Sequence, residues 1–562
     1  MYKSHLRDIG LRDWFSTFSL LILLAACIPA HAQCGGDSYG SSASRQAIQQ
    51  AMLSGSSQDV LNAINTAKEI RGNKVGCPET AYGYSAPSFV VPSLADIADV
   101  WENVHAPGLV GYTIGCPEVG RIWASRALGG YYARSAGYPA DLGALGQIAR
   151  MVEAQQYTAQ HAPPPLVATP GSFGFVHVPS NTPCHLGGGV GSTVDLVCNA
   201  LPELCVNYTG GLFSGQKFLV ADTKPEVGWI DGGIAYDQGW SGVLMLETAR
   251  SHTNTALRQL CLNAVRLAGQ WSEAEPSVSN HNYTAKLIWL LAQLYDWTAE
   301  PVWRTALLDK LHRNLLPGVL MDLDQNGMVD GMTNQPFSTL TSAVARRPGR
   351  MWDGHNAAPV YHAMNSWALI EAYVALRDRG AAAEAAAVKP YAVAMLDNLA
   401  WEVNNLGVGT GLGLSQSPYA FLLGLWKIAA YENETHPEWE KAAWALWNTG
   451  GVNSFGDNSV NAGLYLLYKS GTTYAPLSPV ITVTHIAVGS STSNALTLTW
   501  TGASPDWRYT VEFADSLASS TWQVVGPTNQ WPTAETTWTS GPGSGLVQRY
   551  YRIKARLAWP AD

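Results

Sequence analysis

The sequence predicts a mainly α-helical protein, an α/α toroid of helical hairpins followed by a small C-terminal β-sandwich. Three observations lead to this prediction. Helical segments recur in pairs without a fixed repeat period, which argues against a solenoid. Single helices carry one buried face, as in Leu287, Leu290, Leu291 and Leu294, which have the spacing of a helix packed on a core. The composition then changes at residues 476–479, and strand-like alternation begins beyond them.

The expected helices can be assigned in chain order. Those of the first part are 43–53, 57–71, 93–104, 117–135 and 140–160. Residues 162–235 are rich in Gly and Pro and are expected to form loops with short strands over one end of the body. The later helices pair as 237–251 with 255–271, 281–297 with 301–316, 355–379 with 381–404 and 416–431 with 437–449, followed by 456–469.

Beyond residue 476 the pattern has the period of two that is typical of strands. The expected strands are 480–488, 495–501, 507–513, 522–525 and 548–553. The segments 496–500, 509–512 and 550–553 resemble a fibronectin type III module. The domains are therefore expected to be a signal peptide at 1–32, the helical body at 33–475 and the β-sandwich at 476–562.

The N-terminus has the pattern of an export signal. Lys3, Arg7 and Arg12 precede the apolar run 18–26, and a small-x-small site ends at Ala32. The segment 24–27 also resembles a bacterial lipobox, so a lipid anchor at Cys27 is the alternative. The expected location is secreted, periplasmic or at the cell surface. The apolar run is too short to span a bilayer, and no transmembrane span is expected.

Composition narrows the choice of partner. The chain has 562 residues, only 14% of them charged, and a net charge of −9. This acidic balance argues against nucleic acid, which requires a basic face. The 22 Trp outnumber the 11 Phe, and flat indole rings suit sugar rings as well as protein cores.

Seven cysteines follow Cys27, and an exported protein can keep disulfides. The repeated Gly-Cys-Pro-Glu favours a bridge between Cys77 and Cys116, and one bridge can form among Cys184, Cys198 and Cys205. The odd total leaves at least one thiol free.

Two polar segments stand out in this weakly charged chain. The first is 279–283, with Asn280 and His281 at the start of an expected helix, where backbone N–H groups favour an anion. An N-cap role for Asn280 is the alternative. The second is 346–356, which leads into Tyr361 and His362. The alternative for the second segment is a solvated loop before a helix with Tyr361 in its core.

Together these segments resemble toroid-type polysaccharide lyases of the alginate-lyase-like families. The matching positions are Asn280-His281-x-Tyr283 and Arg350 with Tyr361-His362. The resemblance implies β-elimination of a uronate-containing glycan. Asn280 and Arg350, or Arg347 in place of Arg350, would neutralise the uronate carboxylate. His281 would remove the C5 proton, and Tyr361 would protonate the leaving oxygen or perform both transfers. Expected substrate-binding residues are Trp240, Tyr283, Trp352 and His355.

Residues 322–330 match the first nine positions of an EF-hand-type calcium loop, and they also resemble dockerin repeats. The expected ligands are Asp322, Asp324, Asn326, Met328 and Asp330, with Gly327 at the turn position. Thr333 stands where a bidentate acid is usual. A structural Ca²⁺ is therefore expected, and an ordinary acidic turn is the alternative.

Two other functions compete with the lyase. Asp231, Asp237 and Asp353 could supply the paired carboxylates of a toroid glycoside hydrolase, although Asp237 also suits a helix N-cap. The third possibility is a non-catalytic surface glycan-binding protein. Each of the three would have a polysaccharide or oligosaccharide as its partner.

Overall fold

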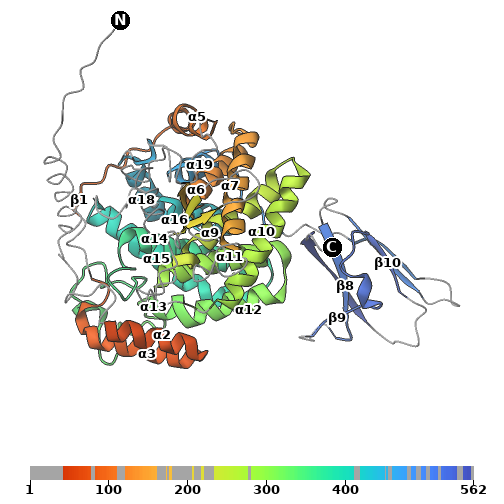
Figure 1. The fold of residues 1–562 in the computed structure, drawn as a ribbon. Coiled ribbons are helices and arrows are strands. Elements are labelled where there is room, and N and C mark those ends of the chain that lie inside the picture. The colour runs from red at the N-terminus through yellow and green to blue at the C-terminus, as the bar shows by residue number, and fades with distance from the viewer. Residues whose placement is uncertain are drawn as a thin grey trace, which may run out of the picture.

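The structure is a computed structural model. It describes residues 42–77, 83–110, 120–160, 173, 176–179, 205–207, 217–220, 233–275, 277, 280–409, 418–449, 451–453, 458–477, 483–488, 495–501, 507–516, 521–540 and 549–558. Within these residues the protein is mainly helical, with a small separate β region at the C-terminal end (Figure 1). The expected signal peptide, Cys27 and Asp231 lie outside the described residues.

The helices begin and end close to the residues that the sequence indicates. In the first part of the chain they are α2 (Ser42–Ser54), α3 (Ser57–Arg71), α4 (Leu94–Val100), α5 (Ala106–Val110), α6 (Gly120–Ser135) and α7 (Leu142–Gln160). Side-chain caps fix several starts. Ser56 accepts from the backbone N–H of Asp59, and Ser93 and Asp96 form a reciprocal capping box.

The later helices also follow the expected pairs. They are α9 (Gly233–Ser251), α10 (Thr255–Ala274), α11 (His281–Thr298), α12 (Pro301–Lys310), α13 (Leu316–Gly318), α14 (Pro359–Asp378), α15 (Ala382–Asn405), α16 (Pro418–Gly424), α17 (Ala430–Glu432), α18 (Pro437–Trp447) and α19 (Ser459–Lys469). One N-cap prediction is wrong, because α9 begins at Gly233 and Asp237 lies inside the helix.

Three helices contain a π-helical segment that the sequence pattern does not predict. These segments are η2 (Trp101–His105), η6 (Leu311–Leu315) and η9 (Leu425–Ala429). Each joins two α-helical pieces into one longer rod. Such segments shift the side-chain register and occur often at functional sites, and η6 lies beside the candidate site described below.

Six helices pack on one another in a cyclic order. α6 contacts α9, α9 contacts α11, α11 contacts α14, α14 contacts α16, α16 contacts α19, and α19 packs back on α6. Four further helices pack on members of this cyclic series without belonging to it: α10 packs on α9, α12 on α11, α15 on α14, and α18 on α16 and α15. Helix α11 is buried on nearly all sides, as expected for a helix enclosed by neighbours.

The β region consists of two antiparallel sheets. Strands β6 (Val483–Val488), β7 (Leu496–Trp500) and β10 (Thr537–Thr539) pair in the order β10-β7-β6. Strands β8 (Trp507–Ala514), β9 (Gln523–Val524) and β11 (Tyr550–Leu557) pair in the order β11-β8-β9. A shared core holds the two sheets together, with Leu498, Trp500, Tyr509, Val511, Val525 and Trp538 buried in it. Strand β10 has no counterpart among the expected strands.

The β region touches the helical body along β11 and α11. Arg379, at the end of α14, donates to the backbone oxygen of Ala555 at 3.4 Å and to that of Trp297 at 3.3 Å. Two smaller strand groups lie in the helical part. β1 (Tyr84–Ser85) pairs with β5 (Val408–Gly409), and β2 (Val176–Pro179), β4 (Lys217–Val220) and β3 (Cys205–Asn207) form a three-stranded sheet.

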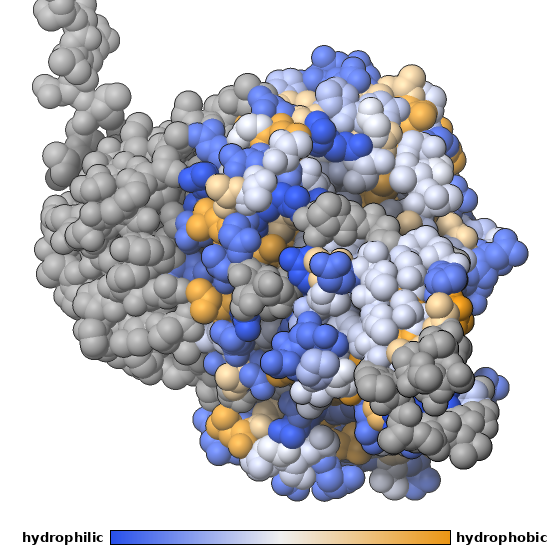
Figure 2. Space-filling view, turned by 90° about the vertical axis from the view of Figure 1, so that its right-hand side faces the viewer, coloured by the Kyte–Doolittle hydropathy of each residue, from blue (hydrophilic) through white to orange (hydrophobic). Residues whose placement is uncertain are grey.

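None of the described helices is long and apolar enough to cross a membrane. On the face drawn in Figure 2, hydrophobic residues are scattered among hydrophilic ones and form no single broad patch. Cys77 is disulfide-bonded, while the expected pairing with Cys116 falls outside the described residues. Cys261 is a free, buried thiol.

Candidate functional site

The two polar segments expected to form the site meet in the structure. The N-terminal end of α11 lies against the turn that precedes α14. The Asn356 side chain donates to Oδ1 of Asn280 at 3.2 Å, and its own Oδ1 accepts from the backbone N–H of Asn282 at 2.8 Å. Asn280 is the N-cap residue of α11 but makes no side-chain cap hydrogen bond. Its amide oxygen is used instead to hold the second segment in place.

His281 is enclosed between the two segments and η6. Its Nδ1 lies 3.1 Å from Oδ1 of Asn314, and its Nε2 accepts from the indole N–H of Trp352 at 3.0 Å. Because an indole can only donate, Nε2 is the acceptor and Nδ1 carries the hydrogen. The side chain is 1% exposed, and burial lowers the pKa of His281 below its ordinary value although Asp353 partly opposes this. His281 is therefore neutral and held at both nitrogens.

Asp353 is fully buried beside this histidine. Its Oδ1 accepts from the backbone and the side chain of Asn356 at 2.8 and 3.2 Å. Its Oδ2 has no hydrogen-bond partner among the described residues and lies 3.8 Å from Nε2 of His281. The carboxylate thus orders the turn before α14, and its burial removes it from contact with water.

Arg350 lies in a second buried cluster. Its Nη1 pairs with Glu402 at 2.5 Å, and the Tyr84 hydroxyl donates to the same carboxylate at 2.5 Å. Both charged side chains are fully buried. The neighbouring His362 donates from Nε2 to the backbone oxygen of Met395 at 3.0 Å, and burial, with a contribution from Arg350, lowers the pKa of His362 to about 3. These residues tie 350–362 to α15.

Tyr361 is the most accessible of the four residues expected to be catalytic. It lies in the first turn of α14, is half-buried, and stacks on the His355 ring with centroids 4.2 Å apart and planes 22° apart. His355 is also half-buried and stands next to Asn356 in the sequence. The stacked pair therefore links the turn that Asn356 joins to α11 with the first turn of α14.

The expected substrate-binding residues occupy different environments. Tyr283 is half-buried near Ala235, Trp271 and Leu287. Trp352 is 2% exposed and packs in the core formed with α2 and α3. Trp240 is 5% exposed and lies in an aromatic cage around the buried Lys286, whose Nζ is 4.6 Å from the Trp240 ring. Trp289 and Trp367 complete that cage.

Asn282 is an additional polar residue at this end of α11. Its side chain is fully buried, and neither Nδ2 nor Oδ1 has a hydrogen-bond partner among the described residues. Leaving a buried amide unsatisfied costs about 1–3 kcal/mol per group. Many other buried polar atoms of the described residues also lack a partner, so this feature alone assigns Asn282 no role.

The acidic loop 322–330 has part of a calcium-loop geometry. The Gly327 N–H donates to Oδ2 of Asp322 at 3.0 Å, the Leu323 N–H to Oδ2 of Asp330 at 3.1 Å, and the Met328 N–H to Oδ1 of Asn326 at 2.8 Å. The other Asp322 oxygen has no hydrogen-bond partner among the described residues. Within the described ranges, no three His, Cys, Asp or Glu side chains are gathered closely enough to hold a metal ion. A calcium site at 322–330 stays a prediction.

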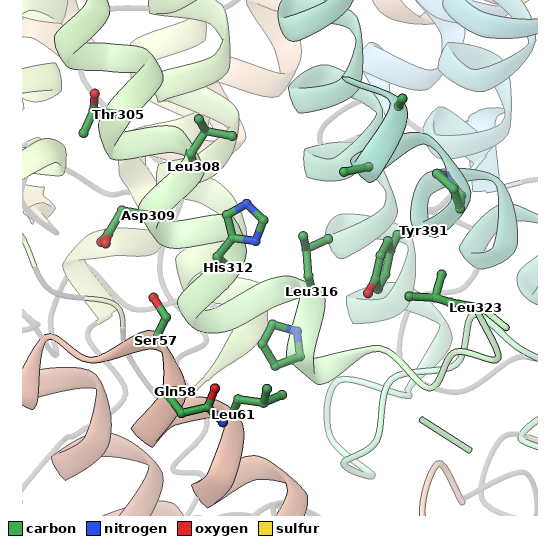
Figure 3. A pocket seen from close by; sticks show the side chains of 14 residues that line it. Ser57, Gln58, Leu61, Thr305, Leu308, Asp309, His312, Leu316, Leu323 and Tyr391 are labelled. Carbon is green, nitrogen blue, oxygen red and sulfur yellow. The ribbon is translucent and has the colours of Figure 1, made fainter. Parts of the chain in front are cut away.

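A groove of about 830 Å³ lies on the other side of η6 (Figure 3). It is bounded by α3, by α12 to α13 and by α15, and His312 and Leu316 project into it while Asn314 and Gly318 face His281. None of the site residues expected from the sequence lines it. Among its lining residues the one carboxylate, Asp309, is paired with Arg313 at 2.7 Å.

Several residues that build the site were not singled out by sequence reasoning. Asn314, Asn356, Glu402 and Tyr84 hold His281 and Arg350. Asn356 lies within the polar segment 346–356, so its residue type could have identified it. Glu402 and Tyr84 are distant from that segment in the sequence.

No known protein family, curated protein or solved structure matches this chain in sequence or fold comparisons.

Proposed function

We propose that this chain is an exported polysaccharide lyase that cleaves a uronate-containing glycan by β-elimination, on a helical body with α/α toroid architecture. The observation that carries the proposal is the Asn356–Asn280 hydrogen bond, which joins the start of α11 to the turn bearing His355 and Tyr361. The cyclic packing of α6, α9, α11, α14, α16 and α19 supports the toroid. The two sheet orders of the β region support a fibronectin type III-like module.

The proposed chemistry assigns proton transfer to Tyr361. In β-elimination the C5 proton leaves, its electron pair forms the C4–C5 double bond, and the C4–O4 bond breaks as the leaving oxygen gains a proton. Tyr361, ionised as phenolate on one face of the sugar, can accept the first proton, and the phenol so formed can return that proton to the leaving oxygen. The stack on His355 fixes the phenol ring in position.

Asn280 and Asn282 are at most 1% exposed, so neither is assigned contact with the substrate carboxylate. The backbone N–H groups at this helix start are also paired, that of Asn282 with Oδ1 of Asn356 and those of Tyr283 and Thr284 with the backbone oxygen of Asn280. His281 and Arg350 are assigned positioning roles because both are buried and held by Trp352 and Glu402 respectively.

The hydrolase alternative has weaker support. Asp353 is fully buried, and its Oδ1 is committed to Asn356. A glycosidase acid or base must reach the glycosidic oxygen or a water, which this position does not favour.

A panel of polyuronates tests the proposal directly. A lyase produces a conjugated double bond, so ultraviolet absorbance should rise as the polymer is cut. New reducing ends without that absorbance would indicate a hydrolase, and binding without either product would indicate a glycan-binding protein. Either of these two outcomes would overturn the lyase proposal.

We also propose that Ca²⁺ binds the 322–330 loop in a structural role. The support is the oxygen-rich sequence pattern together with the Gly327 hydrogen bond to Asp322.

A further inference from the structure

Residues 346–349, here called the arginine turn, present two neighbouring guanidinium groups at the surface. Arg346, Arg347 and Pro348 are exposed. Within the part of the chain that the structure describes, neither arginine forms an ion pair. Arg346 donates from Nε to the backbone oxygen of Leu340 at 2.7 Å, and the Arg347 guanidinium lies 4.4 Å from the Trp401 ring centroid.

Eight other arginines of the described residues are paired with nearby carboxylates. Such pairs are Arg250–Glu247, Arg304–Glu384, Arg313–Asp309, Arg350–Glu402, Arg377–Glu432, Arg379–Asp296, Arg549–Asp515 and Arg552–Glu512. In a chain with a net charge of −9, two adjacent arginines without a carboxylate form a local positive site. Such a site attracts anions that the rest of the surface repels.

The arginine turn is held rigidly by its surroundings. The Asn398 side chain donates to the backbone oxygens of Val344, Arg347 and Pro348 at 2.9, 3.1 and 3.2 Å. Gly349 has φ +96°, and a Cβ there would lie 2.0 Å from the backbone oxygen of Ala394. The close approach of the turn to α15 therefore requires glycine.

The stack on Trp401 prepares Arg347 for recognition of a carboxylate. A cation–π contact holds the guanidinium plane while its N–H edges remain able to donate. A side chain that is already ordered loses less entropy when a ligand binds. Guanidinium groups pair with carboxylates through two parallel hydrogen bonds, which an ammonium group cannot match.

We propose that Arg346 and Arg347 form an accessory binding site for the carboxylates of an acidic polysaccharide, outside the buried His281 cluster. The proposal rests on the proposed function, since it names the charged chain that the lyase would cut. Arg347 and Trp352, which contacts His281, are five positions apart in the sequence, so their Cα atoms are at most about 18 Å apart. One polymer chain can span this distance.

The test uses the full mature chain and three polymers: sodium alginate, dextran sulfate and neutral dextran. Affinity electrophoresis measures binding by wild type and by the Arg346→Gln/Arg347→Gln variant. The matched control is Arg549→Gln/Lys554→Gln, which removes the same charge from β11 and the residue before it. An Arg346→Lys/Arg347→Lys variant keeps the charge but loses the planar fork.

We expect the glutamine variant to bind alginate at least about tenfold more weakly, while the control binds as wild type does. The lysine variant should recover only part of the affinity. Neutral dextran should be unaffected, and higher salt should reduce the difference between wild type and variant. Equal alginate binding by wild type and the glutamine variant would overturn the proposal, as would an equal loss in the control. Tighter arginine-dependent binding of dextran sulfate would overturn the carboxylate assignment.

The two proposals can fail separately. Arginine-dependent alginate binding without any elimination product would contradict the lyase and support the accessory site. Elimination of alginate that is unchanged in KM and kcat in the glutamine variant would support the lyase and contradict the accessory site.

Discussion

Trp352 donates its indole N–H to Nε2 of His281 over 3.0 Å, so the ring nitrogen that could accept a substrate proton is already occupied. The other nitrogen is held by Asn314. Proton removal by His281 would require the Trp352 side chain to leave a position where it is 2% exposed. The arrangement favours a neutral histidine that fixes the start of α11 against the turn before α14.

This burial predicts a pH dependence of stability. The pKa of His281 is lowered in the folded protein by desolvation, while the unfolded chain has the ordinary value of 6.5. Below that value the unfolded chain gains a proton that the folded chain does not. The free energy of unfolding therefore decreases as the pH is lowered. The contribution of His281 should decline by up to about 1.4 kcal/mol per pH unit.

Urea unfolding at a series of pH values measures this effect. The stability advantage of wild type over His281→Gln should shrink between about pH 7 and pH 5. Subtracting the variant removes the contributions of other groups, including Asp296, whose raised pKa has the opposite effect. An advantage that stays constant with pH would contradict the neutral, buried assignment.

The Arg350–Glu402 pair should be important for stability. Glu402→Gln would leave the guanidinium buried beside a neutral amide, and breaking such a pair costs about 3–5 kcal/mol. Glu384→Gln breaks the much more exposed pair with Arg304 and should cost under about 1 kcal/mol. Urea unfolding of the two variants compares them directly, and similar losses would show that Arg350 is not isolated from solvent.

The acidic loop predicts an effect of calcium on thermal stability. A ligand that binds only the folded state raises the unfolding temperature by mass action. Millimolar Ca²⁺ should therefore raise the midpoint above that in chelator, and Asp324→Ala should remove the increase. If the midpoint is the same in both conditions, residues 322–330 are an ordinary turn.

Much of the helical framework could be predicted because periodicity and caps are local signals. The start of α3 after Ser56 and that of α10 after Asn254 follow from side-chain caps within three residues. The π-helical segment η6 could not be predicted, since its extra residue is stabilised by tertiary packing. It turns Asn314 toward His281, a contact that no local pattern indicates.

The site could be predicted only in part for the same reason. The meeting of 280–282 with 350–361 followed from their positions at helix starts. The burial of His281 and Arg350 could not be predicted, because their polar residue types suggested that both side chains would be exposed. Their partners Trp352 and Glu402 are 71 and 52 residues away, and such pairings depend on the complete packing of α11, α14 and α15.

The proposed role of Tyr361 is tested most directly by the rate of double-bond formation from a polyuronate by Tyr361→Phe. The change removes one hydroxyl and keeps the ring that stacks on His355, so folding should be unaffected. Tyr391→Phe, in the groove beyond η6, is the matched control and should retain full activity. We expect Tyr361→Phe to lose about two to four orders of magnitude in kcat, the usual contribution of general acid–base catalysis, with little change in substrate affinity. Full elimination activity in a folded Tyr361→Phe protein would contradict proton transfer by Tyr361.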